Sequence, residues 1–167
     1  MTELVQTGRK GKSSGHVLNN IHCLMIPLQD EILLLPNAAV AEVIAYTSPG
    51  VLADTPEWFL GRISWRDQWV PVLSFEAASG KGNPAEANTQ SRIAVLNTLN
   101  ANVDVPYIGI LTQGIPHLQL VQVDSIKNTP TPGTRQSIAE MAILNDEQVI
   151  IPDVDDLEQR LVRLHKL

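Results

Sequence analysis

The sequence predicts an all-β protein with about nine or ten short strands, closed as barrels or sandwiches. Three observations support this. Short apolar runs recur along the chain, polar turn residues separate them at close intervals, and long helices do not alternate with the strands. The 167 residues, of which 44% are hydrophobic, are enough for one domain with a sizeable core.

Each predicted strand is an apolar or alternating run that ends at a polar turn or a proline. For example, Gln29–Glu31 separates two apolar runs, and the prolines at positions 27 and 36 argue against one continuous helix. The predicted strands cover residues 22–28, 32–36, 43–46, 60–65, 69–73, 93–96, 105–111, 118–123, 139–144 and 148–152.

Few segments have helical character. A short helical turn is expected after Asn37, and a second helix start at 54–58, where Asp54 or Thr55 would cap a turn that begins at a proline. Leucines at helical spacing predict a helix over 153–167, with acidic residues at its positive end. The segments 77–91 and 128–133 are predicted to be loops.

The clearest hairpin joins 60–65 to 69–73. Arg62 and Ser64 alternate with Ile63 and Trp65, and Asp67 tolerates the positive φ of a tight reversal. Pro71 has no N–H to donate, so its strand is expected to have an unpaired side or to lie at a sheet edge.

Charge and composition exclude several classes of function. A formal net charge of −6 disfavours a nucleic-acid partner, which needs a concentrated cationic face. The single cysteine, Cys23, fits a reducing compartment. No run approaches the roughly 20 apolar residues of a membrane span. We therefore expect a cytoplasmic protein without direct membrane insertion, whose polar residues 1–20 form a flexible arm.

The sequence contains no recognisable catalytic or metal-binding pattern. The four histidines have no ligand spacing, and the acidic residues at 153–158 fit helix capping better than a calcium loop. No nucleophile is paired with an obvious base. The sequence thus predicts no catalytic residues, no metal and no cofactor. Two rivals stay open: a small β-barrel that binds a ligand or nucleic acid, and an enzyme built on small barrels.

The segment 58–69 is unusual for its aromatic content. The chain has three Trp, two Tyr and two Phe, and four of these seven side chains lie within these twelve residues. Trp65, Arg66 and Trp69 are of types enriched at binding hot spots. For each Trp, a place in the core is as good an interpretation as a place at a binding surface. Arg66, at a hairpin tip, is expected to be exposed.

The segment 56–73, PEWFLGRISWRDQWVPVL, resembles the central signature of the CheW family. That signature has a proline, two variable residues, a hydrophobe, Gly-Val, then Asn-Leu-Arg-Gly and Pro-Val-Ile-Asp-Leu. Upstream, Val-Ala-Glu-Val at 40–43 resembles the family's Val-x-Glu-Ile. Segments 92–96, 107–111 and 149–154 follow in family order, so the resemblance spans about residues 21–163.

The resemblance implies a fold of two five-stranded β-barrel-like subdomains, intertwined over 21–167, with a C-terminal helix and no cofactor. It implies a non-catalytic adaptor that couples a methyl-accepting chemoreceptor to a CheA-type histidine kinase. The receptor's cytoplasmic tip would bind in the groove between the subdomains, and the kinase on the first subdomain's exposed edge and hydrophobic face. The partner-binding residues expected from the signature are Val40, Glu42, Gly61, Trp65, Arg66 and Asp67.

Three departures from the family pattern indicate a divergent member. Asn-Leu-Arg-Gly is replaced by Ser64-Trp65-Arg66-Asp67, so the Arg is kept and the Gly is lost. The Asp of Pro-Val-Ile-Asp-Leu is Ser74, and the family's Val-Asp-x-Val is replaced at 112–117. Auxiliary adaptors of twitching-motility systems, which control type IV pili, look similar, and the chain is hypothesised to be one of them.

Overall fold

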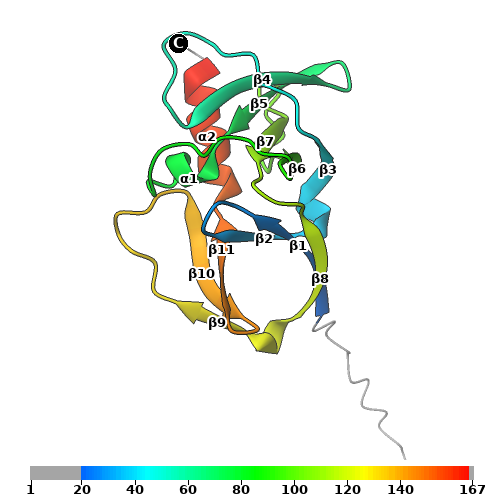
Figure 1. The fold of residues 1–167 in the computed structure, drawn as a ribbon, viewed down its shortest axis with the longest axis vertical. Helices are drawn as coiled ribbons and strands as arrows, with labels where there is room; N and C mark the ends of the chain where they lie inside the picture. Colours follow the sequence, from blue (N-terminus) through cyan, green and yellow to red (C-terminus); the bar gives the residue numbers. More distant parts are fainter. Residues whose placement is uncertain (1–19, 166–167) are drawn as a thin grey trace, which may run out of the picture.

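The computed structural model describes residues 20–165, whose strands form one six-stranded and one five-stranded sheet (Figure 1). In the six-stranded sheet the order is β8-β1-β2-β11-β10-β9, and in the five-stranded sheet it is β3-β6-β7-β5-β4. The strands are β1 (Asn20–Pro27), β2 (Ile32–Pro36), β3 (Val40–Ala45), β4 (Phe59–Trp65), β5 (Gln68–Leu73), β6 (Arg92–Asn97), β7 (Tyr107–Leu111), β8 (His117–Gln122), β9 (Ile126–Thr129), β10 (Ile138–Leu144) and β11 (Glu147–Pro152).

The predicted all-β fold with a C-terminal helix is confirmed, with one difference in the strand count. One sheet has six strands because 126–129, part of which was predicted to be a loop, pairs antiparallel with β10 as β9. The predicted N-terminal arm lies outside the described residues, except for Asn20, which begins β1.

The helices agree only in part with the sequence-based expectations. The 3-10 turn η1 (Asn37–Ala39) and helix α2 (Val154–His165) are confirmed, and the Asp153 side chain caps α2 by accepting from the Asp156 N–H. The helix start at 54–58 is wrong: Asp54 has φ 59, which breaks a right-handed turn, and β4 begins immediately afterwards.

Two short helices were missed, α1 (Phe75–Ala78) and the 3-10 turn η2 (Val123–Ser125). Ser74 caps helix α1, since its hydroxyl accepts from the Ala77 N–H. A single turn offers no apolar periodicity to detect, which explains why 77–91 was predicted to be entirely loop.

The strands next to the junction of the two sheets bury both faces, which explains their continuous apolar runs. In β1, Leu24 and Ile26 belong to a core shared by both sheets and α2, whereas Cys23 and Met25 belong to a core within the six-stranded sheet. A third core is built from side chains of β4, β5 and β6 within the five-stranded sheet. Helix α2 adds Leu157 and Leu161 to the shared core, as its leucine spacing predicts.

The chain leaves the six-stranded sheet after β2, builds the whole five-stranded sheet, and then returns. A parallel pairing of β2 with β11 closes this path. In the five-stranded sheet, β5 lies between β7 and β4, so it is not an edge strand. Its parallel pairing with β7 starts at Val72, just after Pro71, which agrees with the expected unpaired side at that proline.

Candidate functional site

The hairpin of β4 and β5 carries four of the residues expected from the sequence, three of them, Trp65, Arg66 and Asp67, at its tip. Its turn has two residues, Arg66 and Asp67, with φ of 48 and 61, as the tight reversal of a twisted hairpin requires. The residue before the turn, Trp65, is buried, because alternation along β4 turns it and Ile63 toward the third core. Arg66 is therefore exposed at the tip, as predicted.

Glu42, Trp65 and Arg66, which we call the rim cluster, meet across the two edges of the five-stranded sheet. Glu42 lies on edge strand β3, and its Oε2 accepts from Trp65 Nε1 at 2.9 Å and from an Arg66 Nη at 3.3 Å. Trp65 ends the opposite edge strand, β4. The sheet is thus rolled far enough for side chains on its two edges to bond.

Aromatic packing fixes the geometry of the rim cluster. The Arg66 guanidinium lies 4.4 Å from the centre of the Trp65 ring, within cation–π distance. Tyr107 of β7 packs edge-on against the same indole, with ring centres 4.9 Å apart. Sequence reasoning placed Tyr107 in a strand of the family pattern, but it did not predict this contact with Trp65.

The ion pair of the rim cluster faces solvent. The side chains of Arg66 and Glu42 are 63% and 43% exposed, so water and salt screen their attraction. Such a pair contributes about 0–1 kcal/mol to stability. Its atoms therefore stay available to a partner.

Gly61 has a backbone role that separates it from the rim cluster. Its φ is +130, and a Cβ built there would lie 2.4 Å from the Gly50 carbonyl oxygen. This close approach lets Gly50 and Arg62 exchange two backbone hydrogen bonds of 2.8 and 3.1 Å. Gly61 is buried, and it fixes the path of the signature strand.

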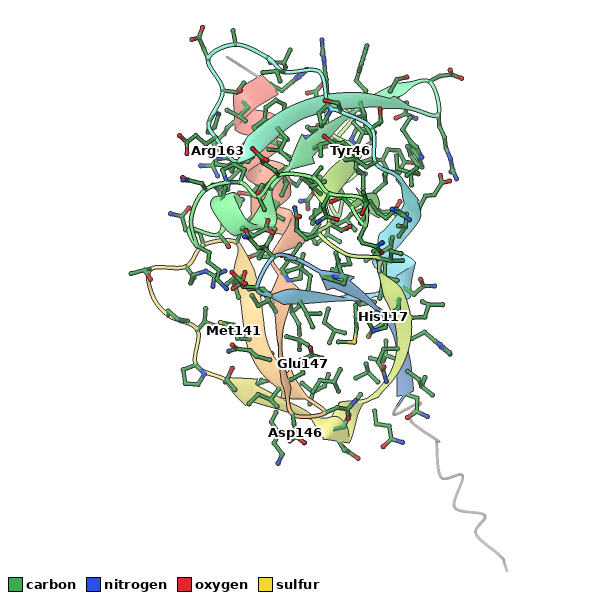
Figure 2. All side chains as sticks on the ribbon, viewed as in Figure 1. Tyr46, His117, Met141, Asp146, Glu147 and Arg163 are labelled. Atoms are coloured by element: carbon green, nitrogen blue, oxygen red, sulfur yellow. The ribbon has the colours of Figure 1, made fainter. Side chains whose placement is uncertain are left out.

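Val40 begins β3 and packs against the shared core, away from the hairpin tip. The turn η1 that precedes it contacts β1, and β1 pairs with β8. Figure 2 shows Tyr46, just after β3, and His117, at the start of β8, one above the other on the same side of the molecule. On this side of the molecule, Val40 thus lies at the boundary between the five-stranded and the six-stranded sheet.

Strand β8 carries an exposed apolar stripe. Leu118 and Leu120 point outward, whereas Val121 faces the core of the six-stranded sheet. The sequence correctly indicated a half-buried strand, yet both leucines lie on the exposed face. β8 is also an edge strand, so it offers apolar side chains beside unpaired backbone groups.

A second exposed feature lies on the outer face of the same β4–β5 hairpin. Trp69 is 61% exposed, and the Arg62 guanidinium lies 4.8 Å from the centre of its ring. Both line a pocket of about 120 Å³ with a largely apolar wall. Its other lining residues are Leu52, Thr55, Phe59, Pro71, Asp104, Val105, Leu161, Leu164 and His165. We call this surface the Trp69 face.

A buried polar network ties the two sheets together. Arg135 donates to both carboxylate oxygens of Glu31, at 2.7 and 3.1 Å, and also to the backbone and hydroxyl oxygens of Ser79. Arg160 bonds the Ala78 carbonyl and the Ser137 hydroxyl and lies 4.6 Å from the centre of the Trp58 ring. Burial lowers the pKa of Arg160, and the neighbouring Asp156 opposes that shift.

Among residues 20–165, no group of three or more His, Cys, Asp or Glu side chains is placed to hold a metal ion. None of the helices that the structure describes is long and apolar enough to span a membrane.

The sequence profile of the CheW-like domain matches residues 22–161, most of the chain. The chain belongs to the CheW-like domain family. Membership makes it a non-catalytic, CheW-like scaffolding adaptor of the chemotaxis type. The solved structures include a similar one, the scaffolding protein TtCheW from Thermoanaerobacter tengcongensis, with a TM-score of 0.66 and 22% identity. The alignment covers 79% of this chain and 83% of TtCheW. A comparison with curated proteins found no match.

In this CheW-like domain, Glu42, Trp65 and Arg66 come together, with Asp67 beside them at the tip. Val40 and Gly61 lie apart from that cluster. Sequence reasoning missed the Trp69–Arg62 pocket, although the crowding of aromatic residues near the hairpin was a usable signal. It also missed the contact of Arg135 with Glu31, which no local pattern reveals.

Proposed function

We propose that the chain is a cytoplasmic adaptor that couples chemoreceptors to a CheA-type histidine kinase at membrane-associated arrays. The observation that best supports this is that one hairpin presents two different surfaces. The rim cluster lies at its tip and inner side, and the Trp69 face lies on its outer side. An adaptor with two simultaneous contacts raises the effective concentration of each partner for the other.

For the receptor's cytoplasmic tip, we propose the side of the molecule that runs from the rim cluster past Val40 to β8. The exposed leucines of β8 provide apolar area, and Glu42, Arg66 and Asp67 provide polar groups at one end. Apolar anchors next to polar residues are typical of protein interfaces. Gly61 would act by holding β4 in place, since it is buried.

For the kinase's regulatory domain, we propose the Trp69 face. An exposed tryptophan and an arginine are the residue types most enriched at hot spots. No carboxylate among residues 20–165 lies within ion-pair distance of Arg62, so its charge is free for a partner. The pocket next to it accommodates one apolar side chain.

A calorimetric titration with two separate probes tests this division. The probes are a receptor cytoplasmic tip fragment and a CheA-type regulatory domain. We expect Arg66→Glu to weaken tip binding at least tenfold and to leave kinase binding unchanged. Trp69→Ala should do the reverse. Lys127→Glu, an exposed change on β9, serves as the control. If both variants weaken the same partner, the two-surface arrangement is wrong.

A narrower assignment, to a system that controls type IV pilus twitching, is supported by the sequence resemblance alone. A pull-down with the purified protein from its own lysate tests it, because the kinase and receptor recovered would identify the pathway. The alternative of a small barrel that binds nucleic acid predicts salt-dependent DNA binding. We expect none, since the net charge is −6.

A further inference from the structure

Trp65 gives this chain a contact that the family pattern lacks. The signature has leucine at this position, and a leucine side chain has no hydrogen-bond donor. Here the indole N–H donates to Glu42 Oε2 at 2.9 Å, and the same oxygen accepts from Arg66 at 3.3 Å. Because Trp65 is buried and packed against Tyr107, its N–H is a fixed donor. The Glu42 carboxylate is therefore held in one orientation.

The bonds of the rim cluster leave particular groups free. Both hydrogen bonds of the Glu42 side chain use Oε2, so Oε1 has no partner among the described residues. Arg66 uses one Nη, and its other N–H groups are not bonded within residues 20–165. The exposed surface of the cluster thus presents an acceptor and several donors side by side.

These free groups favour a neutral ligand that is both donor and acceptor. An incoming ammonium attracted by Glu42 would be repelled by Arg66, which lies only 3.3 Å from that carboxylate. An incoming carboxylate would be attracted by Arg66 and repelled by Glu42. A carboxamide has an NH₂ for the Glu42 oxygen and a carbonyl oxygen for the Arg66 N–H groups. It satisfies both residues without separating them.

We propose that the rim cluster recognises a side-chain carboxamide, from an Asn or Gln of the receptor's cytoplasmic tip. Trp65 is a positioning residue that holds the carboxylate for this contact. The inference depends on the proposed receptor contact and adds the chemistry that this site selects. Replacement of that carboxamide by the corresponding acid or by leucine should weaken binding, because the acid opposes Glu42 and leucine leaves both groups unpaired.

The positioning role is tested first without a partner, by NMR of the indole N–H groups. Trp65→Phe identifies the Trp65 resonance by its loss. Glu42→Ala should then shift that resonance and accelerate its solvent exchange at least tenfold, while the Trp58 and Trp69 resonances stay in place. An unchanged Trp65 resonance in Glu42→Ala would show that the indole does not hold the carboxylate.

The recognition is tested with a receptor tip fragment in which each Asn and Gln is changed in turn to its acid. At one of these positions, the change to the acid should lower the affinity of the fragment for the wild-type adaptor at least tenfold. That loss should shrink to less than threefold in the Glu42→Ala/Arg66→Ala double variant, as coupled sites require. In the adaptor, Trp65→Phe should weaken binding of the unchanged tip fragment about threefold to tenfold, and Trp69→Phe is its matched control.

The outcomes distinguish a failure of the carboxamide inference from a failure of the proposed receptor contact. If the tip binds but none of its carboxamides is coupled to Glu42 and Arg66, the carboxamide inference is wrong and the adaptor function stands. If the tip does not bind the wild-type chain at all, the proposed receptor contact falls, and the inference falls with it.

Discussion

Two Glu–Arg pairs in this molecule have the same chemistry and different surroundings. The side chains of Glu31 and Arg135, at the junction of the sheets, are only 7% and 12% exposed. Those of Glu42 and Arg66, at the hairpin tip, are 43% and 63% exposed. In the buried pair, Arg135 donates to both carboxylate oxygens of Glu31 and to two oxygens of Ser79, whereas the exposed pair shares one hydrogen bond and keeps free groups. Burial thus assigns one pair to architecture and leaves the other for recognition.

The largest expected effect is on the buried pair. Arg135→Ala leaves the Glu31 carboxylate buried, with Lys81 at 3.3 Å as its one remaining ion-pair partner. We therefore expect the free energy of unfolding, measured with urea, to fall by about 3–5 kcal/mol. Lys81→Ala, which removes a more exposed partner of the same carboxylate, should have a much smaller effect. Equal losses for the two variants would mean that the buried geometry of Arg135 is not special.

A backbone change should have the next largest effect, because the exposed pair depends on the path of β4. Gly61→Ala places a Cβ against the Gly50 carbonyl at a φ of +130, and we expect a stability loss of about 2–3 kcal/mol. Gly133→Ala is the matched control, since nothing lies within 4 Å of its Cβ. Normal stability of Gly61→Ala would show that this close approach relaxes freely.

The exposed pair should matter little to folding. Arg66→Ala is expected to change the unfolding free energy by less than about 1 kcal/mol, and less again at high salt. The same variant should lose binding of the receptor tip fragment, as measured by calorimetry. A large stability loss would contradict the comparison, because the two pairs would then have the same role.

The smallest effect concerns Cys23, in the core of the six-stranded sheet. Burial raises the pKa of its thiol, so the folded protein should react slowly with a thiol reagent at pH 8. Arg135→Ala should accelerate this labelling and Arg66→Ala should not.

The raised pKa of Cys23 also affects stability, because the folded state holds the thiol proton more tightly than the unfolded state. Stability should therefore fall slightly as the pH rises above the ordinary cysteine pKa of about 8.5.

Local sequence signals predicted the parts of the fold that local chemistry determines. The hairpin and its reversal at Asp67 follow from the turn preference of that residue, whereas the sequence left open whether Trp65 is buried, and the structure places it inside. The contact of Arg135 with Glu31 spans 104 residues, and no pattern in one sequence reveals such a pair. The same limit applies to Tyr107, which reaches Trp65 only because the sheet is rolled.

The outward face of β8 shows a further limit. Alternation identified a half-buried strand, and it could not say which set of residues is inside, because a shift of one residue exchanges the faces. Here Val121 is inside and the two leucines are outside. The resemblance to the family predicted that Glu42 and Arg66 belong to one surface, whereas the hydrogen bond from Trp65 to Glu42 is seen only in the structure.

The out-and-back path of the chain has a consequence for synthesis on the ribosome. The five-stranded sheet uses one continuous stretch, from β3 to β7, so its pairings become available midway through translation. The parallel pairing of Leu33 with Ile150 must wait until nearly all of the chain has emerged. High sequence separation slows folding. In the nascent chain, β1 therefore lacks its partner β8, and β2 lacks its partner β11, until those later strands have been made, so both edges of the first hairpin are exposed to aggregation during synthesis.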